Sequence, residues 1–77
     1  MDDKKEILQA AGKVCQNARI KLGVSQERMA KILGVNASTV SRFEHGMIDS
    51  LYLNARYQTA IGLLVVLNER RSANDET

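Results

Sequence analysis

The sequence predicts an all-α fold, a bundle of four to five helices, and three observations indicate it. Apolar residues recur at helical spacings of three and four along most of the 77 residues. The chain has no proline and only three aromatic residues, which argues against the turn-rich, β-branched sequence of a β-sandwich. Five glycines divide the chain at near-regular intervals. We expect one domain over residues 1–71 and a disordered tail over residues 72–77.

The first helix is expected from about Asp3 to Leu22. Its predicted buried face carries Ile7, Ala11, Val14, Ala18 and Leu22, which follow one another at spacings of three or four. Asp3 lies at the start, where a carboxylate suits the helix dipole, and Gly23 is a C-terminal stop signal. Gly12 costs about 1 kcal/mol relative to alanine in a helix interior, which a close contact with another helix would explain.

Two short helices are predicted next, joined by residues 34–36. Ser25 and Asn36 are the expected N-cap residues, because their side-chain oxygens accept a free backbone N–H. The predicted inward-facing residues are Met29, Ala30 and Leu33 in the first helix and Val40 and Phe43 in the second. Ala30 is small where the helix axes approach, and Gly34 permits the left-handed backbone of a tight reversal. Together these features indicate a helix-turn-helix.

A fourth helix is expected after the caps Asp49 and Ser50, with Leu53, Tyr57, Ala60 and Ile61 facing inward. Beyond Gly62 the sequence leaves three alternatives open: a short strand, a short last helix, or a continuation of the fourth helix to about Arg70. Adjacent valines favour a short strand over residues 63–68, whereas Arg70 and Arg71 suit the end of a longer helix. Either way, the apolar run exceeds what a small monomer can bury. The predicted dimer interface is therefore Leu63, Leu64, Val65, Val66 and Leu67.

The net charge of +2 conceals a concentration of positive charge in the middle of the chain. The segment from Lys13 to Arg42 has six basic residues and one acid, for a net charge of +5, so the two ends together carry −3. Such a segment favours an anionic partner, with nucleic acid first among the candidates.

Composition and motifs also exclude several classes of protein. One cysteine and one histidine can form neither an internal disulfide nor a metal centre, so no metal is expected. The sequence lacks a catalytic triad, a P-loop and a dinucleotide fingerprint, so we expect no enzyme, no catalytic residue and no cofactor. No apolar run approaches the ~20 residues that cross a bilayer, and the N-terminus lacks the apolar stretch of a signal peptide. A soluble, cytoplasmic protein is expected.

Residues 25–46 resemble the Xre/Cro–lambda-repressor helix-turn-helix family. The resemblance depends on Gln26, Ala30, Gly34-Val35, Ser38-Thr39-Val40-Ser41-Arg42 and Glu44-His45-Gly46, together with the preceding Arg19 and Gly23. It extends from about Val14 to Ile61. The resemblance implies a lambda-repressor-like fold and a sequence-specific transcription regulator, with repression favoured over activation. Such a protein would bind double-stranded DNA as a homodimer on a palindromic operator.

The resemblance also implies which residues would touch DNA. The helix over residues 36–45 would lie in the major groove, with base contacts from Ala37, Ser38, Thr39, Ser41 and Arg42. Ala37 offers a methyl for a thymine methyl, Ser38 can donate or accept, and Arg42 can bind guanine O6 and N7 or a phosphate. Phosphate contacts would come from Ser25, Gln26, Asn36 and His45.

Two further expectations follow from the resemblance. Arg19 and Glu44 match a pair that joins the first and third helices, so they are assigned to a structural ion pair rather than to DNA. After Gly46 the sequence departs from the family, because Asp49 stands where many relatives carry basic residues. The alternative function is therefore an antitoxin-type or other protein-interaction module with the same fold, weak or no DNA binding, and a toxin or other regulator as partner.

Overall fold

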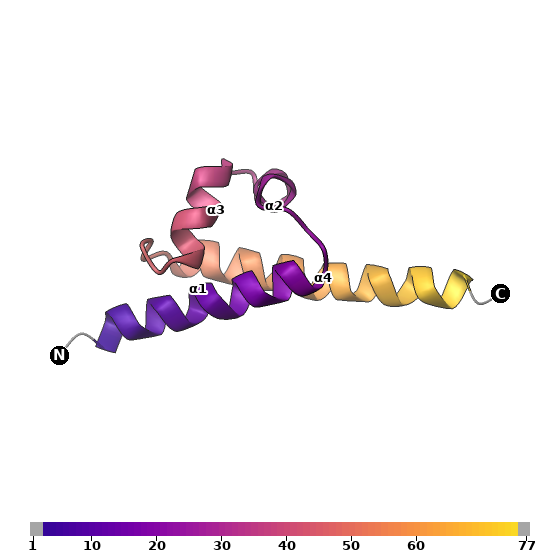
Figure 1. Cartoon of the computed structure of the whole chain (residues 1–77), viewed down its shortest axis with the longest axis horizontal. Helices are drawn as coiled ribbons and strands as arrows, with labels where there is room; N and C mark the ends of the chain where they lie inside the picture. Colours follow the sequence, from indigo (N-terminus) through magenta and orange to yellow (C-terminus); the bar gives the residue numbers. More distant parts are fainter. Residues whose placement is uncertain (1–2, 76–77) are drawn as a thin grey trace.

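The computed structural model describes residues 3–75 of the chain, and side chains over residues 3–71. Within that range it has four helices and no strand: α1 (Asp3–Lys21), α2 (Gln26–Leu33), α3 (Ala37–Glu44) and α4 (Leu51–Asp75). Figure 1 shows α1 and α4 running side by side in the same direction, with α2 and α3 on one side of this pair. The predicted all-α class is confirmed. None of the four helices is long and apolar enough to cross a membrane.

Three of the helices begin at side-chain caps. Ser25 Oγ accepts the Arg28 backbone N–H at 3.0 Å, and Asn36 Oδ1 accepts the Thr39 N–H at 2.9 Å. Ser50 Oγ likewise accepts the backbone N–H of the third residue of α4, at 3.0 Å. These expected N-caps are confirmed. Asp49, the other expected cap, instead forms an ion pair with Lys4 of α1.

The turn between α2 and α3 has the backbone that its glycine allows. Gly34 adopts φ 72° and ψ 32°, the left-handed conformation that side chains disfavour. The next N–H, from Val35, donates to the Ala30 carbonyl at 2.9 Å and so closes the end of α2. Val35 is half-buried against the core. The short turn therefore fixes the angle at which α3 leaves α2.

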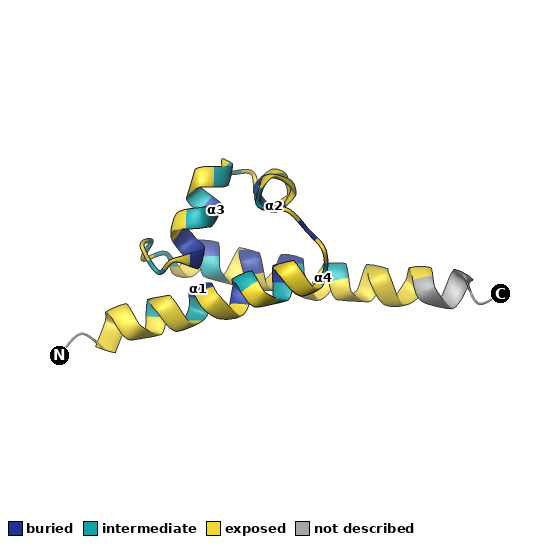
Figure 2. Cartoon of the chain, in the orientation of Figure 1, coloured by how far each residue is buried: buried dark blue, intermediate teal, exposed yellow. Residues whose placement is uncertain are grey.

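The core lies where the four helices meet, and Figure 2 shows the buried positions gathered there. The buried apolar residues are Cys15, Val24, Met29, Ala30, Leu33, Val40, Phe43, Leu53, Tyr57 and Ala60. Every predicted inward-facing residue of α2 and α3 is among them. In α4, Leu53, Tyr57 and Ala60 are buried as expected, and Ile61 is half-buried. Residues 65–71 of α4 extend beyond this core and are exposed (Figure 2).

The predicted buried face of α1 is wrong by about one residue. Ile7 and Val14 are 67% and 64% exposed, and Gly12, Cys15 and Arg19 are buried instead. Ala11, Ala18 and Leu22 lie half-buried at the edges of this face. A glycine and an arginine carry no apolar signal, and for that reason the face was misplaced.

Gly12 explains why α1 turns this face inward. A Cβ built at Gly12 would lie 2.4 Å from the Phe43 carbonyl oxygen and 2.6 Å from that of Glu44. The C-terminal turn of α3 therefore rests directly on the backbone of α1, at a distance that only glycine permits.

The alternative of a strand over residues 63–68 is wrong, because these residues lie inside α4. A strand here would leave its backbone N–H and C=O groups without a partner strand, whereas a helix pairs them within itself. The helix also continues past Arg70 to Asp75. Of the tail expected over residues 72–77, residues 72–75 have the backbone of α4, and residues 76–77 lie outside the described part.

Candidate nucleic-acid interface

The outer side of α3 carries the polar residues that were expected to read bases. Ser38 and Arg42 are exposed, and Thr39 and Ser41 are half-buried. Ser38 and Arg42 are four residues apart, so they lie on the same side of the helix, one turn from each other. Ala37 is half-buried and packs against the core, so part of its methyl group is already in contact with protein.

Asn36 organises the N-terminus of α3. Its Oδ1 accepts three hydrogen bonds, from the Thr39 backbone N–H at 2.9 Å, the Ser38 hydroxyl at 2.7 Å and the Thr39 hydroxyl at 2.8 Å. Both hydroxyl protons are therefore already donated within the protein. The hydroxyl oxygens remain as acceptors, and the Asn36 amide group keeps its two N–H donors. This end of α3 offers defined donors and acceptors rather than freely rotating hydroxyls.

Arg42 differs from these residues in having no internal partner. Its guanidinium forms no hydrogen bond or ion pair with any residue in the described part of the chain. All five N–H donors are therefore available to an external acceptor. Of the residues expected to read bases, Arg42 is the one with the longest reach and an unused charge.

Two of the four expected phosphate contacts lie near the C-terminal end of α3. His45 follows that helix, and its ring Nδ1 donates to the Ser41 carbonyl at 2.7 Å, which leaves Nε2 unused. Gln26, the first residue of α2, is half-buried and donates from Nε2 to Glu44 Oε1 at 3.1 Å. Its neighbour Ser25 is exposed. The start of α2 therefore lies beside one end of α3, whereas Asn36 lies at the other.

A buried ion pair holds this interface in place. Arg19 Nε and Nη2 donate to the two carboxylate oxygens of Glu44, at 2.7 and 3.0 Å. The two residues are only 7% and 3% exposed. The third nitrogen, Nη1, donates to the Val24 carbonyl at 2.8 Å and so secures the loop before α2. The pair expected between the first and third helices is present with bidentate geometry.

The sequence reasoning missed two further donors to the Glu44 carboxylate. Tyr57 of α4 donates its phenolic O–H to Glu44 Oε2, and Gln26 of α2 donates to Oε1. One carboxylate therefore binds residues of α1, α2 and α4 to the last turn of α3. No buried side-chain nitrogen or oxygen in the described residues lacks a hydrogen-bond partner. The tyrosine on the predicted inward face of α4 could have indicated this hydrogen bond, because a buried carboxylate needs several donors.

The electrostatics of this cluster follow from burial and hydrogen bonding. Burial alone would raise the pKa of the Glu44 carboxyl, but hydrogen bonds from Arg19, Tyr57 and Gln26 hold that pKa below its usual value. Burial and the hydrogen bond to Glu44 raise the pKa of the Tyr57 phenol. Burial and the charge of Glu44 raise the pKa of the Cys15 thiol to about 11. Glu44 is therefore an anion and Tyr57 a neutral donor at neutral pH.

The comparisons with known proteins agree with this geometry. Residues 16–51 match the family model described as helix-turn-helix. The match spans the second half of α1, both helices of the turn and the start of α4. No curated protein and no solved structure matches the chain. Residues 16–51 are thus a helix-turn-helix of the Xre and lambda-repressor-like family, a DNA-binding regulatory domain.

Proposed function

We propose that this protein is a sequence-specific transcription regulator that inserts α3 into the major groove of duplex DNA. The observation that carries the proposal is the exposed, unpaired Arg42 on the outer side of a helix held by the buried Arg19–Glu44 pair. A rigid helix with one free guanidinium presents the donor geometry that guanine O6 and N7 accept. A flexible helix would bind DNA more weakly, because ordering it on the DNA would cost conformational entropy.

The remaining contacts divide into base reading and positioning. Ser38 and Thr39 present acceptors, and the Asn36 amide presents donors, at the end of α3 that enters the groove. Ala37 and Ser41 lie beside them with smaller exposed areas. Phosphates are assigned to Ser25, Gln26, Asn36 and His45, which flank the two ends of α3.

The acidic residue after the helix-turn-helix does not oppose this function. Asp49 pairs with Lys4, so its carboxylate is accompanied by a positive charge. A phosphate near this loop would meet a neutral pair rather than an isolated anion, because opposite charges in contact largely cancel at a distance. Asp49 is therefore only a weak argument against DNA binding.

We propose further that the protein acts as a homodimer through the C-terminal half of α4. Five consecutive helical residues cannot share one face, because each turns about 100° from the last. Leu63, Val66 and Leu67 fall on one side, and Leu63 is 61% exposed. Leu64 is half-buried against the core, and Val65 lies toward the opposite side. The interface proposed over residues 63–67 is therefore formed mainly by Leu63, Val66 and Leu67.

An apolar groove continues this surface toward α2. It has a volume of about 570 Å³ and is lined mainly by apolar side chains, among them Ile32, Leu33, Tyr52, Leu63 and Leu67. A second copy of α4 seated there would cover the exposed leucines. Two copies related by a two-fold axis would present two α3 helices to half-sites about one helical turn apart, the arrangement that a palindromic operator requires. Repression in the cytoplasm, by occupying a promoter, is the outcome that needs no further partner.

Selection from a library of randomised duplexes tests the proposal. The full chain should enrich a palindromic motif, and its affinity for that motif should fall steeply between two salt concentrations as counterions are released. Enrichment of no motif at either salt concentration would overturn DNA reading and favour the protein-interaction alternative. Nonspecific binding, recognised by salt dependence without a motif, would also contradict it.

A further inference from the structure

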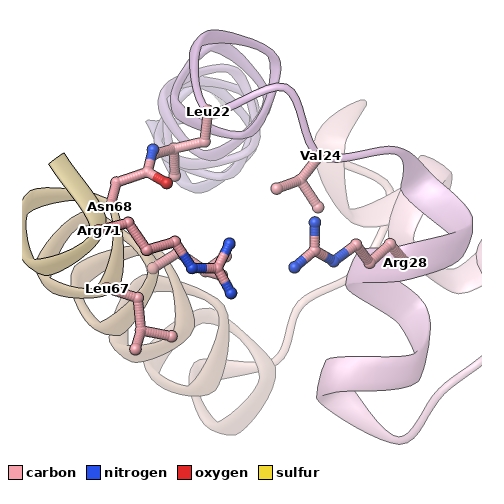
Figure 3. A pocket seen from close by; sticks show the side chains of 7 residues that line it. Leu22, Val24, Arg28, Leu67, Asn68 and Arg71 are labelled. Atoms are coloured by element: carbon pink, nitrogen blue, oxygen red, sulfur yellow. The ribbon is translucent and has the colours of Figure 1, made fainter. Parts of the chain in front are cut away.

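A small pocket lies between the first turn of α2 and the C-terminal half of α4. Its apolar wall includes Leu22, Val24 and Leu67, and its polar side chains are Arg28, Asn68 and Arg71. Figure 3 shows the side chains of Arg28 and Arg71 reaching toward one another across the pocket from the two helices. Neither arginine belongs to the set assigned to DNA or to the buried cluster around Glu44.

The pocket gathers positive charge, and no acidic residue is among the described residues that line it. Arginine stays protonated in proteins, so both guanidinium groups are cations at any physiological pH. Within the described residues, no carboxylate forms an ion pair with Arg28 or Arg71. Two facing cations repel each other. An anion bound between them would be attracted to both and would offset that repulsion. Asn68 adds an amide N–H₂ that can donate to the same anion.

The size and walls of the pocket restrict the ligand further. Its volume is about 40 Å³, which exceeds the space of one water but holds no more than a small group. Both arginines are exposed, so an anion can reach their guanidinium groups from solvent. Guanidinium forks match planar or tetrahedral oxyanions with two acceptor oxygens. The body of a larger ligand would project from the pocket mouth.

We propose that this pocket binds one oxyanion group, a carboxylate or a phosphate, of a small molecule. Arg28 and Arg71 would each donate to the oxyanion, and Asn68 would donate at its edge. The bound group would join α2 to the part of α4 that extends beyond the core. The proposal does not depend on DNA binding, because the pocket is complete in a single copy of the chain.

An NMR titration of the full chain without DNA tests the site. Inorganic phosphate and acetate are the two probes, each compared with chloride at constant pH and ionic strength. At least one probe should give saturable shifts of the backbone amides of residues 22–28 and 64–71, with millimolar affinity, about −4 kcal/mol. Saturation by phosphate alone identifies a phosphate ligand, and saturation by acetate alone identifies a carboxylate ligand. Shifts that are linear and alike for phosphate, acetate and chloride would overturn the proposal.

Matched variants separate the pocket from general charge. Arg28→Gln and Arg71→Gln should each weaken binding of the probe by about tenfold or more, because each removes a charge-assisted pair. Arg70→Gln removes the same charge from the adjacent exposed position and should leave the affinity within about twofold. An equal loss in Arg70→Gln would overturn the proposal. The proposal would also be overturned if Arg71→Gln bound the probe like the parent but bound DNA more weakly. That result would assign Arg71 to a contact with the DNA backbone.

Discussion

Arg19 and Glu44 form a bidentate ion pair that joins α1 to the last turn of α3 across 25 residues of sequence. Both side chains are buried, and the same carboxylate accepts hydrogen bonds from α2 and α4. This carboxylate therefore helps to fix the orientation of α3 relative to the other three helices.

Replacing Glu44 by alanine should destabilise the fold strongly. The substitution leaves the Arg19 guanidinium buried without its anion, a defect that costs about 3–5 kcal/mol. We expect a matching decrease in the free energy of unfolding, measured by urea denaturation followed by circular dichroism. Glu69→Ala, at an exposed position on α4, is the control and should stay within about 0.5 kcal/mol of the parent. A Glu44→Ala midpoint equal to that of the parent would contradict the role given to the pair.

Two glycines inside helices should respond to alanine with opposite signs. Helix propensity favours alanine by about 1 kcal/mol at either position. At Gly62 nothing lies within 4 Å of the added Cβ, so Gly62→Ala should raise the thermal midpoint. At Gly12 the Cβ would meet backbone oxygens at 2.4 and 2.6 Å, so Gly12→Ala should lower it. Stabilisation by both substitutions would show that α1 and α3 are not in close contact at Gly12.

The stability of the protein should fall at both ends of the pH range because of the Glu44 cluster. The folded-state pKa of Glu44 lies below its ordinary value of 4.5, so its contribution is present above that pH and is lost as the pH falls through the folded-state pKa. The folded-state pKa of Tyr57 lies above its ordinary value of 10.0, so its contribution is present below pH 10.0 and is lost as the pH rises beyond it.

Thermal midpoints measured from acid to alkaline pH test this pair of effects. Tyr57→Phe keeps the ring packing and removes the phenol, so the alkaline decline above pH 10 should become shallower in this variant. Tyr52→Phe, an exposed tyrosine on the same helix, should keep the alkaline decline of the parent. If the two variants gave the same alkaline profile, Tyr57 would not be the group responsible.

The proposed dimer predicts different effects for the same substitution at two adjacent valines. Val66→Lys places a charge on the side of α4 that carries Leu63 and Leu67, and it should raise the dimer dissociation constant by about tenfold or more. Val65→Lys makes the same change toward the other side of the helix and should leave the dimer intact. Sedimentation velocity over a range of concentrations measures both. A parent protein that stays monomeric at every concentration would overturn the dimer.

Local signals were enough to predict the centre of the fold. Ser25, Asn36 and Gly34 are fixed by hydrogen bonds and dihedral angles within a few residues, and each lies where the sequence placed it. The inward faces of α2 and α3 followed from spacing alone, because the helices are short and amphipathic. The family resemblance then supplied the Arg19–Glu44 pairing, which no spacing rule could have provided.

The predictions that were wrong concern features that tertiary contacts determine. The face of α1 was misplaced because its buried stripe contains Gly12 and Arg19, which an apolar pattern does not detect. The hydrogen bond from Tyr57 to Glu44 depends on how α4 packs, which the local sequence does not encode. Residues 63–68 have β-branched members and helical neighbours, so propensity could not choose between a strand and the continuous α4.

The affinity of Arg42→Ala for the selected operator and for operators with single base-pair changes tests the central claim most directly. If α3 reads bases through Arg42, the substitution should cost about 1–3 kcal/mol and abolish discrimination at one base pair in each half-site. Lys13→Ala, which removes a positive charge from an exposed position on α1, should leave both the affinity and the discrimination unchanged. An Arg42→Ala protein that binds as tightly as the parent, with discrimination intact at every base pair, would contradict the account.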